Sequence, residues 1–351
     1  MSEIEGSDGT LSAEAEGDQR VVFCFRGRKL YDEDVPRELD SVSLHCQWLD
    51  MSENALTDAC IHDLCQSLSA LPHLRKLSLQ NNSFTADGVA TLLLQSAQCP
   101  QLVCCEVGHQ FRVDYSSTLE SGRLARVLEQ ILCAADGTSL VKLGLEDLAL
   151  GRDAAMGIAQ GLRKNRRLRI LNLSGNRITV HGAEALAEAL QENNSLQELR
   201  LDGCLICADG SFAMGDMLTL NRGLRKLNLG QNRLRGLGIY EIAESLRVNN
   251  TLHSLVLSKN LINKEGWDFL KEAMRVNTSL VNLTCSKLPG CPVMEYFLSI
   301  NQEVHPAFVL QESKCSVLVD ALFVFLNHAV QLKVAFERSC DGPVREEEFD
   351  A

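Results

Sequence analysis

The sequence predicts an α/β solenoid shaped as a horseshoe, with a parallel sheet on its concave face, helices on its convex face and a cap at each end. Apolar residues recur at fixed spacings in successive segments of 28 residues, a period typical of repeat architectures. Within each segment, alternating apolar residues precede apolar residues about four apart, which indicates a strand and then a helix. Because 45% of the residues are hydrophobic and only 5% are aromatic, we expect an aliphatic core.

The strand part of each segment has the form L-x-x-L-x-L-x-x-N. Complete copies begin at Leu74, Leu168, Leu224 and Leu252, and a copy that ends in cysteine begins at Leu196. With weaker copies, about nine repeats are predicted, beginning at positions 46, 74, 102, 140, 168, 196, 224, 252 and 280. Seven of the eight steps are 28 residues long, and the step from 102 to 140 contains ten more.

The last position of this pattern is expected to hold neighbouring repeats together. An asparagine amide there can hydrogen-bond backbone groups that would otherwise be buried without partners, and a cysteine thiol is a weaker substitute. These structural ladder residues are Asn54, Asn82, Asn176, Cys204, Asn232 and Asn260. Another asparagine closes the helix of each repeat, and these residues are Asn165, Asn193, Asn221, Asn249 and Asn277.

Over about residues 46–305, these units resemble the ribonuclease-inhibitor-like class of leucine-rich repeats. A glycine or small residue fourteen positions after each start, as at Gly182 and Gly210, is similar to that class, as is the mixture of asparagine and cysteine in the ladder. The resemblance implies a scaffold, adaptor or inhibitor that binds another protein, because a solenoid presents a large rigid surface at a low ordering cost.

Segments outside the repeat domain at 46–305 are expected to cap it or to remain disordered. Residues 1–20 and 341–351 are predicted to be disordered acidic tails, which carry −5 and −4 of the net charge of −12. Residues 21–45 are predicted to form the N-terminal cap. Residues 306–340 are predicted to form a C-terminal helical cap, and a helix that docks on a partner is the alternative.

The N-terminal cap is expected to contain two strands, at 21–25 and 42–44. Turns are predicted between them, near Gly27 and at 32–36, because glycine, aspartate and proline favour turns.

The extra residues between the third and fourth repeats are predicted to form an insertion at 107–122. Insertions in repeat arrays form loops on one face, often the binding face. Phe111, Arg112 and Tyr115 are residue types that anchor interfaces, so we take them as candidate partner-binding residues. A tolerated surface loop without a function is the alternative.

Several classes of function are not expected from this sequence. It contains no P-loop and no G-x-S-x-G motif, its acids do not pair across adjacent strands, and its histidines are scattered, so we expect no catalysis, cofactor or metal. Without a basic stripe, nucleic-acid binding is not expected. The most apolar stretch, at 317–336, contains Asp320 and Lys333, which argues against a membrane span.

A cytoplasmic location is expected, because the sequence begins with acidic and polar residues rather than a secretory signal. The cysteines are then expected to be reduced. Nuclear, ciliary and cytoskeletal locations remain open.

The concave face is the expected binding surface, since alternate strand residues point away from the core into it. Trp48 is a candidate anchor there, although packing under the N-terminal cap is the alternative. The candidate partner-binding residues on this face are Trp48, Asp50, Lys76, Glu106, Lys142, Glu146, Asn172, Glu198, Arg200, Asp202, Lys226 and Asn228.

The sequence therefore predicts a non-catalytic intracellular scaffold or adaptor that binds protein partners, with cytoskeletal and ciliary roles among the options. The alternative is a regulator of a partner enzyme, such as an enzyme inhibitor or an activator of the GTPase Ran. The Ran activators are built from similar repeats and end in acidic sequence, but their acidic tail is longer and their repeat lengths vary. The sensor arm of an immune receptor is a further option, although no nucleotide-binding module precedes these repeats.

Overall fold

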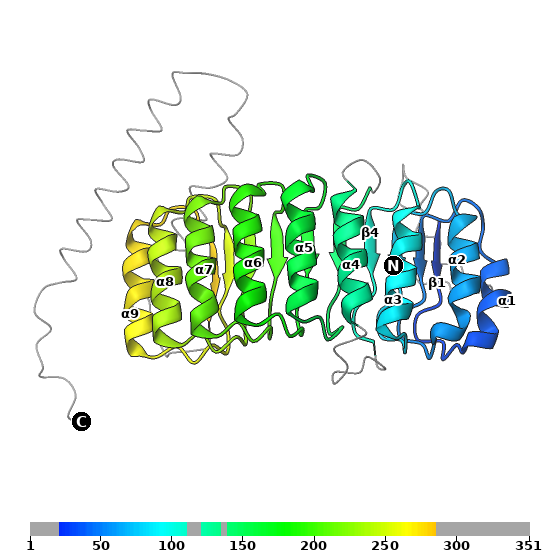
Figure 1. Ribbon diagram of the computed structural model, residues 1–351, viewed down its shortest axis with the longest axis horizontal. Helices are drawn as coiled ribbons and strands as arrows, with labels where there is room; N and C mark the ends of the chain where they lie inside the picture. The colour runs from blue at the N-terminus through cyan, green and yellow to red at the C-terminus, as the bar shows by residue number, and fades with distance from the viewer. Residues whose placement is uncertain (1–20, 111–120, 135–138, 286–351) are drawn as a thin grey trace, which may run out of the picture. The chain divides into compact units, whose positions relative to one another are not determined.

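The computed structural model describes residues 21–110, 121–134 and 139–285, all of which lie in the first of two compact units, residues 1–291. Within these ranges, ten strands form one parallel sheet in which each strand pairs with those before and after it in the chain (Figure 1). The strands are β1 (Val22–Cys24), β2 (Trp48–Asp50), β3 (Lys76–Ser78), β4 (Cys104–Glu106), β5 (Lys142–Gly144), β6 (Ile170–Asn172), β7 (Glu198–Arg200), β8 (Lys226–Asn228), β9 (Ser254–Val256) and β10 (Asn282–Thr284).

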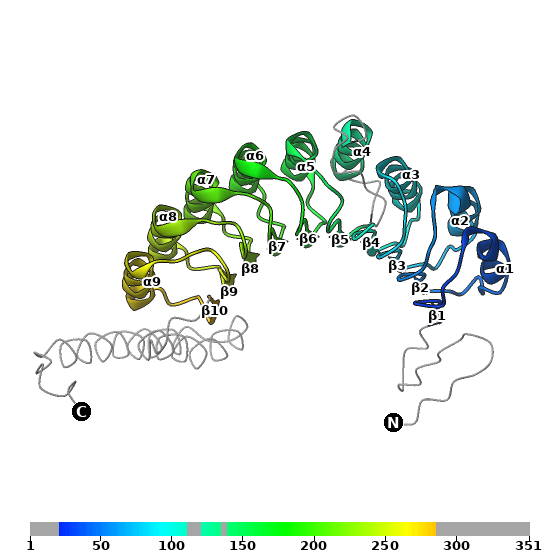
Figure 2. The same ribbon diagram turned by 90° about the horizontal axis from the view of Figure 1, so that it is seen from below.

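Helices alternate with these strands and cover one face of the sheet (Figure 2). The α-helices are α1 (Val35–Asp40), α2 (Ile61–Ser69), α3 (Ala86–Ala97), α4 (Ser121–Cys133), α5 (Arg152–Lys164), α6 (Thr179–Glu192), α7 (Cys207–Leu220), α8 (Arg235–Val248) and α9 (Lys264–Val276). Two 3₁₀-helices, η1 (Asp32–Asp34) and η2 (Asp58–Cys60), precede α1 and α2. The predicted fold class, a solenoid with a curved parallel sheet, is confirmed.

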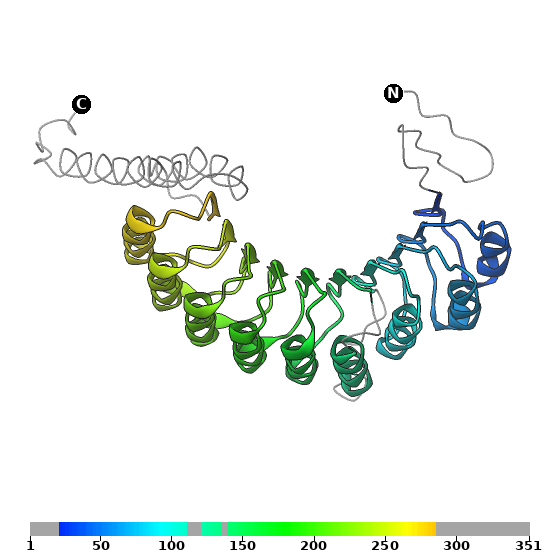
Figure 3. The same ribbon diagram turned by 90° about the horizontal axis from the view of Figure 1, so that it is seen from above.

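The sheet lies on the inner side of the curve because strands stack more closely than helices (Figure 3). Neighbouring strands are about 4.8 Å apart, whereas a helix with its side chains is about 10 Å thick. The core lies between the two layers. Leu49, Leu77 and Leu143, the central residues of β2, β3 and β5, are fully buried, and Leu49 pairs in register with Leu77.

The segment at 21–45 contributes to the same sheet. β1 pairs in parallel with β2, and η1 and α1 follow it as the helices of later repeats follow their strands. The strand predicted at 42–44 is wrong, since a bend and a turn occupy these residues. The turn predicted at 32–36 is also wrong, because η1 and α1 begin there. Pro36 fits the first turn of α1, where its missing N–H would have no partner within the helix.

Asparagine side chains join each repeat to the preceding one. The Asn176 Nδ2 donates to the backbone oxygens of Leu145 and Leu173, both at 2.8 Å, and its Oδ1 accepts from Leu148 N and Leu150 N, both at 3.0 Å. Asn54, Asn82, Asn232 and Asn260 bond in the same way. Cys204 donates only its thiol, to Leu173 O at 3.1 Å and Asp202 O at 3.7 Å.

The ladder also has a member that the sequence pattern missed and a position that it lacks. The Gln110 Nε2 donates to Leu79 O at 3.0 Å and to Val107 O at 2.8 Å, so Gln110 takes the asparagine position of its repeat. The first residues of the predicted insertion at 107–122 therefore continue the repeat. In the next repeat this position holds Leu148, which is buried and has no polar side chain to donate.

A second row of asparagines lies where the helices end. The Asn193 Nδ2 donates to Leu162 O at 2.6 Å and to Asn165 O at 2.9 Å, and its Oδ1 accepts from Leu196 N at 3.0 Å. Asn165, Asn221, Asn249 and Asn277 also reach back to the preceding repeat. Thus each described repeat from α5 to α9 is joined to its predecessor at this end of the helix.

Candidate functional site

A row of side chains crosses four neighbouring strands, β2 to β5, on the concave face. The Lys76 ammonium lies 4.1 Å from the centroid of the Trp48 ring, a cation–π contact. Glu106 lies between two lysines, with 3.6 Å from its Oε2 to the Lys76 Nζ and 2.5 Å from its Oε1 to the Lys142 Nζ. The charges of three repeats are therefore paired side by side.

A second charged group lies across β7 and β8. The Glu198 carboxylate is 2.5 Å from the Arg200 guanidinium and 3.6 Å from the Lys226 Nζ. Asp202 is not part of this group, since its Oδ2 accepts from Gln231 Nε2 at 2.7 Å. The Asn228 Oδ1 accepts from Gly230 N at 2.9 Å, which fixes the turn after β8.

In both groups the carboxylate is buried more deeply than the cations that it binds. The side chains of Glu106 and Glu198 are 13% and 11% exposed, whereas Lys142, Arg200 and Lys226 are 35%, 48% and 64% exposed. The face is mixed in charge by composition, but its cationic ends are the ones in contact with solvent.

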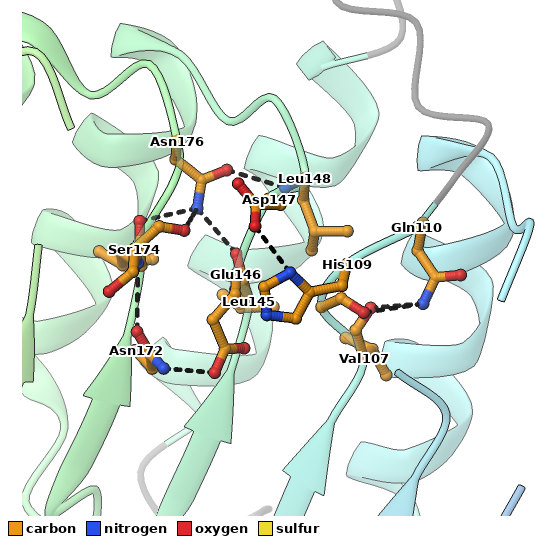
Figure 4. Close-up of polar contacts among 12 residues, drawn as sticks. Val107, His109, Gln110, Leu145, Glu146, Asp147, Leu148, Asn172, Ser174 and Asn176 are labelled. Carbon is orange, nitrogen blue, oxygen red and sulfur yellow. Dashed lines mark hydrogen bonds and ion pairs between the residues drawn. The ribbon is translucent and has the colours of Figure 1, made fainter. Parts of the chain in front are cut away.

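Glu146 lies between these two groups, in space left by two glycines (Figure 4). A Cβ atom on Gly108 or Gly144 would lie 2.6 Å or 2.9 Å from the Glu146 Oε2. The Glu146 Oε1 accepts from the Asn172 amide, whereas its buried Oε2 has no hydrogen-bond partner among the described residues. Beside it, the His109 Nδ1 lies 2.6 Å from the Asp147 Oδ2.

Burial raises the pKa of Glu146, and the nearby charge of Glu106 adds to this effect. The expectation that acids do not pair across adjacent strands is therefore wrong at this point. Burial alone would lower the pKa of Lys142, but its hydrogen bond to Glu106 and that carboxylate's charge outweigh burial, so the pKa of Lys142 is raised.

Glu146→Gln is expected to raise the melting temperature at pH 7. A carboxyl group whose pKa is raised by folding destabilises the folded chain as the pH rises above the ordinary carboxyl range, because its charged form is less favourable there than in the unfolded chain. The gain should shrink as the pH falls towards about 4, where Glu146 is protonated in both states. Thermal denaturation at several pH values measures it, with the exposed Glu33→Gln as control. A melting temperature at pH 7 equal to or below that of the unaltered chain would contradict this account.

The remaining predicted site residues differ in their availability. Asp50 is 6% exposed, and its Oδ1 accepts from Ser52 N at 3.0 Å and from Ser52 Oγ at 2.5 Å, so the structure does not offer it to a partner. Trp48 is half-buried beneath Lys76, next to Val22 of β1, and matches neither a free anchor nor a fully covered residue. Phe111, Arg112 and Tyr115 lie outside the described residues, as do both tails and the segment at 306–340.

Searches for other kinds of site gave two plain results. Among the described residues, no cluster of three or more histidine, cysteine, aspartate or glutamate side chains is arranged to hold a metal ion. Nor does any described helix combine the length and the apolar character needed to cross a bilayer.

Comparisons with known proteins agree with the fold. A family model described as a leucine-rich repeat matches residues 70–93 and 164–187. No curated protein matches the sequence. The chain is a leucine-rich-repeat protein.

Two solved structures are similar in fold to part of the chain. One, described as leiomodin-1 actin-binding site 2, is 23% identical with a TM-score of 0.42, and the match covers 46% of this chain and 95% of that one. The other is the tropomodulin C-terminal domain from Caenorhabditis elegans, 15% identical with a TM-score of 0.40 over 45% of this chain and 99% of that one.

Proposed function

We propose that this chain is a non-catalytic protein-binding scaffold or adaptor whose partner contacts the concave face of the sheet. The observation that carries the proposal is the arrangement of Glu106 and Glu198 beneath the cations of neighbouring strands. These contacts hold the charged ends in place before a partner arrives. Binding therefore loses less side-chain freedom than it would on a surface of independent long side chains.

The core beneath this face supports a scaffold role for the same reason. The central residues of β2, β3 and β5 to β9 are leucines, each buried and paired in register with its neighbours. Close packing makes such an interior stiff, so the spacing between the concave side chains is set by the sheet. A partner that matches this spacing is favoured over one that does not.

A cytoplasmic location is part of this proposal. Burial raises the pKa of the free thiols of Cys46 and Cys204 to about 11 and about 12, so that both are protonated and poorly reactive at neutral pH. Buried thiols of this kind are stable in a reducing compartment.

The test compares two charge-matched triple variants of the full chain in partner capture from native lysate. E198Q/R200Q/K226Q neutralises the β7–β8 group, and E244Q/R247Q/K271Q makes the same three kinds of change on the convex helices α8 and α9. We expect the concave variant alone to lose specific proteins, with both variants keeping their melting temperature. Capture that is equal for both variants and the unaltered chain would contradict the concave face as the binding surface.

A further inference from the structure

The edge of the sheet where β6 to β8 begin carries a concentration of positive charge, although the whole chain has a net charge of −12. The loops before β6 and β8 contain five arginines, called here the basic edge: Arg166, Arg167, Arg169, Arg222 and Arg225. The expectation of no basic stripe does not hold for this part of the molecule. Glu192, at the end of α6, is the carboxylate that lies among these three loops, 163–169, 192–197 and 220–225.

The arginines of the basic edge bond to backbone oxygens rather than to carboxylates. Arg166 donates to Arg163 O at 2.9 Å, Arg169 to Ser195 O at 2.9 Å and Arg225 to Thr251 O at 3.2 Å. Arg222 donates to Asn221 O at 3.3 Å. In the part of the chain that the structure describes, none of the five forms an ion pair. Their charge is therefore available to an anionic group.

Backbone hydrogen bonds fix the spacing of this edge. Gln197 N donates to Arg169 O, and Arg225 N donates to Gln197 O, both at 2.8 Å, so Arg169 and Arg225 are two strands apart. Two strand spacings are about 10 Å. Carboxylates on one side of an extended peptide recur about every 7 Å, and arginine side chains are long enough to bridge the difference.

Exposed aliphatic residues lie at the same end of the helices. Leu220, the last residue of α7, is 57% exposed, and Val248, the last residue of α8, is 59% exposed. A polypeptide with apolar side chains can cover them, whereas a nucleic acid backbone cannot. The negative charge of the rest of the chain also disfavours a long polyanion more than a short acidic segment.

We infer that the basic edge binds an extended acidic segment of a partner protein, one in which aspartate or glutamate alternates with aliphatic residues. This surface is separate from the β2–β5 and β7–β8 groups of the proposed function, although Arg225 directly precedes Lys226.

The test measures fluorescence anisotropy of a labelled peptide of about twelve residues that repeats Asp-Asp-Leu, since aspartate is a poor helix former. The full-length chain is compared with R167Q/R222Q/R225Q, which keeps Arg166 and Arg169 and their backbone bonds. R152Q/R233Q/R235Q is the matched control, because it removes three exposed arginines near the starts of α5 and α8. We expect about tenfold weaker binding for the edge variant, no change for the control, and weaker binding of the unaltered chain at higher salt.

Other results would overturn the inference. These are binding of an Asn-Asn-Leu peptide with equal affinity, equal loss in both triple variants, or tighter binding of an oligothymidylate of similar length with the same arginine dependence. Loss of peptide binding in E198Q/R200Q/K226Q but not in the edge variant would transfer the peptide to the concave face. If the edge variant does not fold, Arg167→Gln alone decides the question, because the Arg167 guanidinium makes no hydrogen bond among the described residues.

Discussion

Replacing Asn232 with alanine is expected to lower the free energy of unfolding by about 4 kcal/mol. The Asn232 Nδ2 donates to Leu201 O, Leu229 O and Gly230 O at 2.7 to 3.0 Å, and its Oδ1 accepts from Cys204 N and Ile206 N at 2.9 and 3.2 Å. The side chain is fully buried, so water cannot replace these bonds. Each unsatisfied buried group costs about 1–3 kcal/mol, and two N–H groups lose their acceptor together. Urea denaturation measures the loss.

The matched control is Asn228→Ala in the same repeat. Asn228 is half-buried on the concave face and accepts one printed-length bond, from Gly230 N at 2.9 Å. Its loss is expected to cost less than about 1 kcal/mol, because water can reach the turn. Asn232→Cys should fall between the two, as the thiol of Cys204 keeps a donor but supplies no comparable acceptor. Equal losses for Asn228→Ala and Asn232→Ala would show that the ladder is not what holds the repeats together.

Reversing both cations of the β7–β8 group, in R200E/K226E, is expected to lower the free energy of unfolding by on the order of 2 kcal/mol. Glu198 is 8% exposed and has these two cations as its ion-pair partners. The substitutions leave its carboxylate buried and place two more negative charges beside it. Thermal and urea denaturation at neutral pH measure the effect, which should decrease at high salt.

Two comparisons separate this effect from a general effect of charge. E198Q/R200Q/K226Q removes the buried charge together with its partners and should retain most of the stability. Arg247→Glu reverses a cation whose partner, Glu244, is 46% exposed, and should cost a few tenths of a kcal/mol at most. A loss for Arg247→Glu as large as that for R200E/K226E would rule out burial of the carboxylate as the cause.

The repeat pattern predicted the fold because its residues are chosen by burial. Leu77 and Leu171 must be apolar to fill the core, so the period of 28 residues is visible without a structure. The bonds of Asn176 and Asn232 follow from the same logic, since a buried turn needs a donor and an acceptor at one fixed position. Gln110 was missed because ten extra residues follow it, and the break in spacing hid its place in the repeat.

The charges of the concave face were less predictable. Alternation along a strand places Asp50, Glu106 and Arg200 on one face, but it does not say which of them water reaches. Asp50 turns to Ser52 and becomes buried, whereas Arg200 extends over Glu198. Such choices depend on neighbours 28 or more residues away. The basic edge was missed for a similar reason, because Arg169 and Arg225 meet only when three repeats are stacked.

The two asparagine rows give the solenoid a direction. Asn82 and Asn176 each satisfy backbone groups of the repeat before them, and Asn193 and Asn249 do the same at the helix ends. Each repeat is thus completed by its successor. During synthesis, a repeat that leaves the ribosome still lacks these partners until the next about 28 residues have emerged. Growth from the N-terminus therefore adds stability one step behind the chain, and loss of a repeat from the C-terminal side exposes more unmet backbone groups than loss from the other.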